Sequence, residues 1–263
     1  MTFDMQGRID ECFLISYAVD AARAESLVPP QLEVLTHGGR AFLNIVVCHV
    51  HRMRPALAPS FLGISYWHVA YRLHVRAPLA DGRSIDGLYF LRSDADSAVV
   101  GAIANRMTAF RFHPADVRFE SARGGWTMRV VDRRGQGSAM LRVVPASSDI
   151  PEIAEDPPFP SIQDRERVLK YAPFGLSVSR TGTRVRIAEV KRHEALWKEE
   201  PVSVEAADWS YAEALGLSTD RLVRATRVAP IDYIWRIGLS GERAKRSGAR
   251  ERRGASGSPR VSV

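Results

Sequence analysis

The clearest strand in the sequence is Gly63-Ile64-Ser65-Tyr66-Trp67-His68-Val69-Ala70-Tyr71-Arg72-Leu73-His74-Val75-Arg76. From residue 68 onward its side chains alternate in character. One face carries Val69, Tyr71, Leu73 and Val75, and the other carries His68, Ala70, Arg72, His74 and Arg76. A period of two with β-branched and aromatic residues is typical of a half-buried strand. The stretch therefore predicts a strand with one apolar face and one polar face.

The residues that follow predict a hairpin and then a helix. Asp81-Gly82 suits a tight turn, because glycine accepts the positive φ that such turns require, and the return strand covers residues 85–91. Residues 98–107 are rich in helix formers. The preceding segment 93–97 offers capping side chains, and we expect Asp94 and Asp96 to serve the helix N-terminus rather than catalysis.

The rest of the chain repeats strands joined by short turns. Strands are expected over residues 11–19, 32–35, 40–51, 112–120, 126–132, 138–144, 176–180, 184–193, 202–205, 222–228 and 231–237. Short helices are expected after Asp20, over 162–171 and over 206–215, and the proline-rich segment 145–160 reads as a surface connector. Without a βαβ alternation, this order favours an α+β fold of mostly antiparallel sheet with flanking helices.

Composition is that of an ordinary globular protein. Of the 263 residues 45% are hydrophobic and 25% charged, which allows one large domain or two small ones. The start of the chain does not read as a signal peptide, and the longest apolar run, 41–50, is interrupted by Asn44 and His49, so we expect no membrane span. Cys12 and Cys48 form no metal or disulfide pattern. A cytoplasmic protein with two buried cysteines is the expectation.

The positive charge is concentrated at the C-terminus. The net charge is +7, but residues 240–263 contribute +5 of it and residues 1–239 only +2. The last segment is rich in Gly, Ser and Arg, so we expect a basic disordered tail over 240–263. A weak electrostatic contact with nucleic acid or anionic lipid through this tail is the less favoured interpretation.

Several motifs resemble a bacterial family. Tyr66-Trp67-His68-Val69, Gly87-Leu88-Tyr89-Phe90, Asp94-Ala95-Asp96-Ser97 and Gly101-Ala102 are similar to an uncharacterised branch (YqjF-like) of the acetoacetate decarboxylase-like superfamily. The segment Leu27-Val28-Pro29-Pro30-Gln31-Leu32-Glu33, followed by Gly39-Arg40-Ala41-Phe42, resembles that family's opening motif. The similarity covers roughly residues 12–238. It implies a cone-like β-barrel with outer helices and an inner cavity, formed as one domain over 1–239.

The chemistry of acetoacetate decarboxylases does not carry over with the fold. In that family a lysine beside a second lysine forms a Schiff base with the substrate, and crowding the two lowers the nucleophile's pKa. The matching region here, residues 107–112, has no lysine, and the chain contains only Lys170, Lys191, Lys198 and Lys245. Arg111 cannot replace the nucleophile, because a guanidinium stays protonated. Whether the protein is a lyase-like enzyme or no enzyme stays open, and no cofactor is expected.

His68 and Arg72 are the leading site candidates. His68 stands where relatives carry a cavity-facing glutamate, and histidine would place the proton-transferring group near neutral pKa. Arg72 matches an arginine of the uncharacterised branch and would bind an anion; the two lie about 13 Å apart along a strand. Tyr89 and Arg106 are further ligand-binding candidates by their place in the similar motifs. The alternative is that His68, Arg72, His74 and Arg76 form the solvated face of an ordinary strand.

The remaining motifs give weaker indications of function. His49 and His51 would share a strand face at metal-binding separation, but no third ligand is recognisable, so we expect an exposed face and no metal site. His113 and Asp116 are candidates by residue type alone. Gly135-Gln136-Gly137 lacks the third glycine of a dinucleotide loop and suits a hairpin.

Three hypotheses of function follow. The first is an enzyme or former enzyme acting on a small carbonyl or carboxylate compound in the cavity without a Schiff base, with His68 as acid/base and Arg72 as anion clamp. The second is a non-catalytic small-molecule-binding protein using the same cavity. The third, the least favoured, is nucleic-acid contact through the tail. The sequence leaves homo-oligomerisation open.

Overall fold

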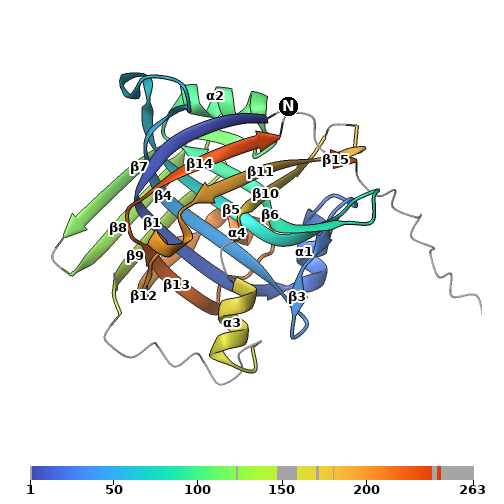
Figure 1. Cartoon of the computed structure of the whole chain (residues 1–263). Coiled ribbons are helices and arrows are strands. Elements are labelled where there is room, and N and C mark those ends of the chain that lie inside the picture. The colour runs from blue at the N-terminus through green and yellow to red at the C-terminus, as the bar shows by residue number, and fades with distance from the viewer. Residues whose placement is uncertain are drawn as a thin grey trace, which may run out of the picture.

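The computed structural model describes residues 2–122, 124–146, 159–169, 172–179, 181–238 and 242–243. Most of these residues belong to one extended sheet (Figure 1). Its strands are β1 (Thr2–Asp20), β2 (Glu33–Val34), β3 (Thr36–His37), β4 (Arg40–Pro55), β5 (Ile64–Pro78), β6 (Ser84–Ala95), β7 (Phe112–Ala122), β8 (Gly125–Asp132), β9 (Ser138–Pro145), β10 (Phe174–Val178), β11 (Arg184–Arg192), β12 (Glu199–Trp209), β13 (Leu222–Val228), β14 (Ile231–Gly238) and β15 (Glu242–Arg243).

Short helices flank the sheet. They are α1 (Ala21–Leu27), α2 (Ala98–Met107), α3 (Ile162–Leu169) and α4 (Ser210–Ala214), with 3₁₀ turns η1 (Ser60–Leu62) and η2 (Glu194–Leu196). In Figure 1, α2 lies at the top of the molecule and α3 at the bottom. In the described part of the chain, no helix is long and apolar enough to cross a membrane.

The sheet closes on itself twice. The strand order β10-β11-β14-β1-β13-β12-β9-β8-β7-β6-β5-β4-β3 is supplemented by pairings of β1 with β4 and of β10 with β6. One closed circuit therefore runs β1-β4-β5-β6-β10-β11-β14, which we call the cavity ring. A second circuit runs from β1 through β13, β12, β9, β8 and β7 back to β6, β5 and β4. The two rings share β1, β4, β5 and β6.

Because the shared strands separate two interiors, both of their faces are buried. Val69, Tyr71 and Leu73 face the hydrophobic cluster of the second ring. Ala70, on the other face of the same strand, belongs to the cluster of the cavity ring together with Cys48 from the neighbouring strand. The alternation predicted from the sequence is confirmed, but the polar face looks into a second interior rather than into solvent.

Distant parts of the chain meet in the cavity ring. Thr2 pairs with Gly238 and Ile9 with Ile231, so the first strand lies against β14, as Figure 1 shows in blue and red-orange. The ring then closes through a short parallel pairing in which Gly175 meets Leu88. Next to it Gly87 leaves no space for a side chain, since a Cβ there would lie 2.6 Å from the Phe174 carbonyl oxygen. The absence of a side chain at residue 87 therefore allows β10 to pair with β6 and close the cavity ring.

The expected α+β fold, dominated by antiparallel pairing, is confirmed, with parallel pairing only of β6 to β7 and to β10 among the described strands. The helix over 98–107 and the three-strand meander over β7, β8 and β9 occur where the sequence predicts them. Gly82 and Gly135 have the positive φ values, 87° and 70°, that their turns require. The connector 145–160 lies outside the described residues over 147–158, as does nearly all of the predicted tail.

The assignment of Asp94 and Asp96 to the helix N-terminus is wrong. Ser97 is the N-cap of α2, and its hydroxyl accepts from the Val100 N–H at 3.3 Å. Asp96 instead accepts from the backbone N–H of Trp67 at 2.9 Å, which ties the end of β6 to β5. Asp94 lies within β6 and is buried, because the strand extends four residues farther than the sequence indicates.

Candidate functional site

The cavity ring encloses a small internal cavity of about 40 Å³. That volume exceeds what a single water molecule occupies, which is on the order of 10–15 Å³ by the same kind of measure. The walls are mainly aliphatic and aromatic. The lining residues are Ile9, Cys12, Val46, Cys48, Val50, His68, Arg72, Leu88, Phe90, Phe110, Ala172, Phe174, Gly175, Ala188, Val190, Trp197, Tyr233 and Trp235.

Strand register arranges polar groups in two rows across β1, β4 and β5. Of these residues, the first row and Arg72 line the cavity itself. In the first row Cys12 pairs with Cys48, and Cys48 pairs with His68. In the second row Ser16 pairs with Asn44, and Asn44 with Arg72. Between them lies an apolar row formed by Leu14, Val46 and Ala70. Residues separated along the chain by up to sixty positions thus form one polar strip.

His68 is a buried neutral imidazole. Its side chain is 4% exposed, its ring stacks on Phe112 at 5.0 Å, and its Nε2 atom has no hydrogen-bond partner in the described structure. Burial, reinforced by the charge of Arg72, lowers the pKa of His68 to about 3. The near-neutral pKa expected from the sequence is therefore wrong, because both effects disfavour the imidazolium.

Arg72 is 2% exposed and is held by a side chain from the neighbouring strand. Its Nη2 donates to Asn44 Oδ1, while Asn44 Nδ2 donates to Ser16 Oγ at 2.9 Å. Its guanidinium carbon lies 5.8 Å from the centre of the Phe90 ring. The amide of Asn44 is thereby fixed with its oxygen toward the guanidinium, so the orientation of Arg72 follows from a hydrogen-bonded row rather than from an ion pair alone.

The sequence left open that His68, Arg72, His74 and Arg76 form the solvated face of a strand. The structure excludes this interpretation for three of these four side chains. His68, Arg72 and His74 are all buried, whereas Arg76 is exposed and pairs with Asp86 at 2.6 Å. Burial and the charge of Arg72 also lower the pKa of His74, to about 4. This face of β5 therefore carries one charged side chain, Arg72, between the two neutral histidines His68 and His74.

Tyr89 and Arg106 do not join His68 and Arg72. Tyr89 is buried on the opposite face of β6, within the second ring, and its hydroxyl accepts from Arg111 Nη2 at 2.9 Å. Arg106 lies in the last turn of α2, is exposed, and does not line the cavity. Of the four site residues predicted from the sequence, only His68 and Arg72 line the same cavity.

Sequence reasoning missed that both cysteines line the cavity. They are buried as expected, and burial raises the pKa of Cys48 to about 12 and that of Cys12 well above its usual range. They are therefore protonated thiols at neutral pH and belong to the apolar wall. Only the pairing of β1 with β4, which the sequence pattern does not specify, places them beside His68.

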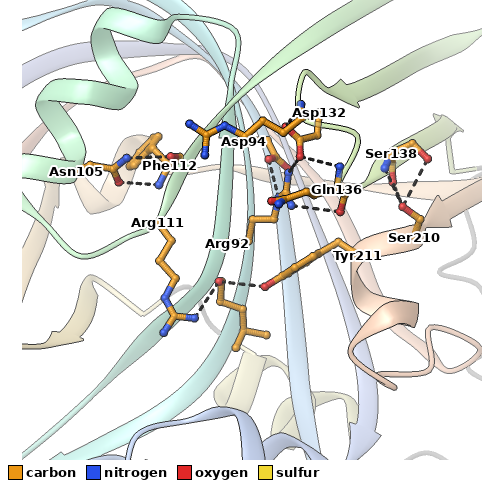
Figure 2. Close-up of polar contacts among 12 residues, drawn as sticks. Arg92, Asp94, Asn105, Arg111, Phe112, Asp132, Gln136, Ser138, Ser210 and Tyr211 are labelled. Carbon is orange, nitrogen blue, oxygen red and sulfur yellow. Dashed lines mark hydrogen bonds and ion pairs between the residues drawn. The ribbon is translucent and has the colours of Figure 1, made fainter. Parts of the chain in front are cut away.

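A second polar cluster lies away from the cavity, in the second ring (Figure 2). Arg92 forms ion pairs with Asp94 at 2.7 Å and with Asp132 at 2.9 Å, and all three side chains are at most 5% exposed. Asp132 also accepts the backbone N–H groups of Arg134 and Gln136, both at 3.0 Å. These contacts fasten β6 to the turn between β8 and β9. Despite Arg92, burial raises the pKa of Asp94 to about 6.

His49 and His51 are partly exposed on β4, each with Nδ1 3.7 Å from Asp10 Oδ2. His51 Nδ1 also lies 3.2 Å from Ser65 Oγ. Among the described residues, no group of three or more His, Cys, Asp or Glu side chains is arranged to hold a metal ion.

The described lysines lie outside the cavity. Lys198 is exposed, and Lys191, 40% exposed, pairs with Glu189 at 3.5 Å. Lys170 and Lys245 lie outside the described residues. At the position equivalent to the family's lysine region, Phe110 points into the cavity and stacks on Phe90 at 4.1 Å.

Comparison with solved structures identifies the fold. The chain is similar to an acetoacetate decarboxylase-like enzyme from Sphingomonas wittichii RW1, with a TM-score of 0.58, 12% identity, and coverage of 92% of each chain. It is similar to acetoacetate decarboxylase from Legionella pneumophila, with a TM-score of 0.58, 14% identity, and coverage of 91% of this chain and 87% of that one. It also resembles the enduracididine biosynthesis enzyme MppR complexed with pyruvate, with a TM-score of 0.55, 12% identity, and coverage of 92% and 90%.

The fold is thus that of the acetoacetate decarboxylase-like proteins. Within that class, residues 7–230 match the model of the family DUF2071, described as an uncharacterized conserved protein, and the chain belongs to this family. A search of curated proteins found no match to the sequence.

Proposed function

We propose that this protein binds a small carboxylate or carbonyl compound in the cavity of the cavity ring. The observation that carries the proposal is that the unpartnered Nε2 of His68 and the guanidinium of Arg72 line the same cavity. A buried polar atom without a partner is rare in native proteins and often marks a position that a ligand or water completes. A carboxylate supplies an acceptor for His68 and a charge partner for Arg72.

The apolar walls strengthen this interaction. Val46, Leu88 and Phe90 surround the polar strip with low-dielectric material, where a charge-assisted hydrogen bond is stronger than in water. Arg72 is the one side chain carrying a full charge among the described residues that line the cavity. The site therefore suits a compound with one acidic group and an otherwise apolar body.

Any turnover would proceed without a Schiff base. None of the described lining residues is a lysine, and the neutral imidazole of His68 can donate or accept a hydrogen bond but carries no proton to give away as an imidazolium. A bound carboxylate would offset the charge of Arg72 and raise the pKa of His68 toward the range useful in proton transfer. MppR, a structural neighbour, is described in complex with pyruvate, which supports a 2-oxo acid as the first compound to test.

A thermal-shift screen of small keto, hydroxy and unsaturated acids tests the proposal, because specific binding raises the melting temperature by mass action. The matched pair of variants is Arg72→Lys and Arg76→Lys: both keep the charge, but only Arg72 lines the cavity. We expect stabilisation by at least one acid, lost or much reduced in Arg72→Lys and unchanged in Arg76→Lys.

A second variant changes the cavity without substituting residue 72, so it tests the proposal even if Arg72→Lys impairs folding. Val46 lies between the two polar rows and lines the cavity, so Val46→Leu should reduce the space while leaving both polar groups in place. Binding that survives both Arg72→Lys and Val46→Leu, or the absence of binding by any acid, would refute the cavity as a carboxylate site. For an acid that binds, product analysis by NMR in wild-type and His68→Gln protein then distinguishes an enzyme from a binding protein.

A further inference from the structure

One end of the molecule displays large apolar side chains that nothing in the described chain covers. The loop between β4 and β5 exposes Leu57 completely (101%), Phe61 by 81% and Leu62 by 57%. We call these three residues the apolar tip. Three leucine and phenylalanine side chains at this level of exposure within six positions form an apolar patch of the kind that marks an interaction site.

Helix α2 presents further apolar side chains at the same end. Val99 and Ile103 are 58% and 46% exposed on its outer face. The loop leads into the first residues of β5, and those residues lie beside the last residues of β6, from which α2 continues: His68 pairs with Ala95. In Figure 1 the blue-green loop projects from the top of the molecule, where α2 also lies.

Prolines and backbone hydrogen bonds restrain the loop that carries the tip. Pro55 and Pro59 restrict the backbone, and the Ala56 N–H donates to the Asp4 carbonyl oxygen at 2.9 Å. Within the loop the Leu62 N–H donates to Pro59 at 3.1 Å. Because the backbone is fixed in advance, burying the tip in a partner loses little conformational entropy.

A groove rich in arginine adjoins the tip. Its volume is about 640 Å³, and Ser60, which lies in the loop next to Phe61, is part of its wall. We call it the basic groove. Its charged lining residues are Arg8, Arg52, Arg54, Lys191, Arg192 and Asp232. Three of these cations pair with acids in or beside the groove: Arg8 with Asp10 at 3.0 Å and Asp232 at 3.7 Å, Lys191 with Glu189 at 3.5 Å, and Arg192 with Glu194 at 3.1 Å. The positive charge of the groove therefore rests mainly on Arg52 and Arg54.

Arg52 and Arg54 differ from the paired cations of the groove. Arg54 donates to the carbonyl oxygens of Ala58 at 3.2 Å and Arg52 at 3.0 Å, and neither Arg52 nor Arg54 forms an ion pair with an acid of the described residues. Arg52 also has a φ of 51°, unusual for a residue with a side chain, at a register shift in β4. Such irregularities change the direction in which the side chains of the strand point.

We propose that the apolar tip and the basic groove together dock the protein onto an anionic lipid surface. Apolar side chains flanked by Arg are the combination that interfacial membrane binding requires: the apolar groups enter the headgroup–acyl boundary, and the cations attract anionic lipid. A second copy of the chain fits less well, because a two-fold contact through this end would bring the same uncompensated arginines close to one another.

Vesicle co-sedimentation of the full chain tests the proposal. We expect binding to vesicles that contain phosphatidylglycerol, weak binding to pure phosphatidylcholine, and weaker binding as salt concentration rises. The double variant L57S/F61S should lower the partition coefficient on the order of tenfold or more, since two large apolar groups no longer enter the bilayer. R52E/R54E should abolish the preference for the anionic lipid.

Matched control variants show whether an effect on binding is specific to this surface or follows from any change in surface charge or hydrophobicity. V131S/L222S removes apolar side chains that are 57% and 38% exposed on β8 and β13, and R118E/R129E reverses two exposed arginines on the β7–β8 sheet. Both controls should bind vesicles like the wild type. The basic residues after 239 are present in every variant, so binding that L57S/F61S leaves intact would assign adsorption to them and overturn the proposal. Loss of self-association in L57S/F61S, without loss of lipid binding, would identify a second copy as the occupant and overturn it equally.

Discussion

Arg72 and Asn44 form the central contact of the candidate site: the guanidinium donates to an amide oxygen that is itself aligned by Ser16 across two strand pairings. All three side chains are buried. Asn44 and Ser16, both neutral, thus help to orient the arginine, and its positive charge adds to the larger effect of burial in lowering the pKa values of His68 and His74.

Asn44 should act as a positioning residue for ligand binding. Asn44→Ala removes the acceptor of a buried guanidinium, and the unfolding free energy should fall by ~1–3 kcal/mol. Affinity for any acid identified by thermal shift should fall as well. Isothermal titration and chemical denaturation measure the two effects. Ser16→Ala, one step farther from Arg72, should affect affinity less; an equal or larger loss would contradict the proposed order.

Acidification should destabilise the protein through His68. The folded-state pKa of about 3 lies below the ordinary 6.5, so between these values the unfolded state binds a proton that the folded state does not. Stability contributed by the neutral imidazole is present above pH 6.5 and lost as pH falls, by ~1.4 kcal/mol per pH unit. His74, with a pKa of about 4, adds a second contribution of the same sign.

Urea denaturation at several pH values measures this slope. His68→Gln should have a shallower dependence than the wild type between pH 6 and 4, by ~1.4 kcal/mol per unit. Asp94, whose raised pKa of about 6 acts in the opposite direction above pH 3.8, is common to both proteins and cancels in the difference. Parallel curves for wild type and His68→Gln would show that His68 is not buried as described. His193→Gln, at an exposed position, serves as the control.

The Arg92 cluster should be important for stability. Asp132→Asn leaves a buried guanidinium with one acidic partner, and the unfolding free energy should fall by ~3–5 kcal/mol, as for other buried pairs that lose one member. Asp86→Asn breaks the exposed pair with Arg76 and should change it by less than ~1 kcal/mol. Comparable effects of the two substitutions in chemical denaturation would contradict the burial of the cluster.

Gly87 should be needed for closure of the cavity ring. Gly87→Ala places a Cβ 2.6 Å from the Phe174 carbonyl oxygen and 2.9 Å from Leu176, so β6 and β10 must separate. We expect a loss of ~1–3 kcal/mol and faster hydrogen exchange in β10. Gly101→Ala, in helix α2, would place a Cβ 3.7 Å from the Cβ of Phe112, an ordinary contact, and should be neutral or stabilise by ~0.5–1 kcal/mol. A neutral Gly87→Ala would rule out the close approach.

Much of the fold could be predicted from the sequence because it follows local rules. Alternation fixed the faces of β5, and the glycine turns at 82 and 135 marked hairpins correctly. Burial of the polar face could not be predicted, since period two gives the same pattern for a solvated face and for a second interior. Likewise, Cys12 and Cys48 became neighbours of His68 only through the pairing of β1 with β4, a contact between segments whose register no local signal specifies.

The candidate site was predicted only in part for the same reason. His68 and Arg72 share a strand face, so their common cavity followed from spacing once the resemblance placed that face inside. Tyr89 was assigned from motif proximity, yet an odd number of positions along β6 separates it from the cavity-facing Leu88 and Phe90. The low pKa of His68 depends on burial in three dimensions, which the residue type does not reveal.

Pairing of Thr2–Ile9 with Ile231–Gly238 has a consequence for biogenesis. During translation β1 emerges more than two hundred residues before its partner β14, so the wall of the cavity stays incomplete until residue 238 has been synthesised. Such non-local pairings fold slowly and leave unpaired strand edges exposed meanwhile. Nascent chains of this protein should accordingly depend on chaperones until β14 is available, and the proposed binding site can form only after that pairing.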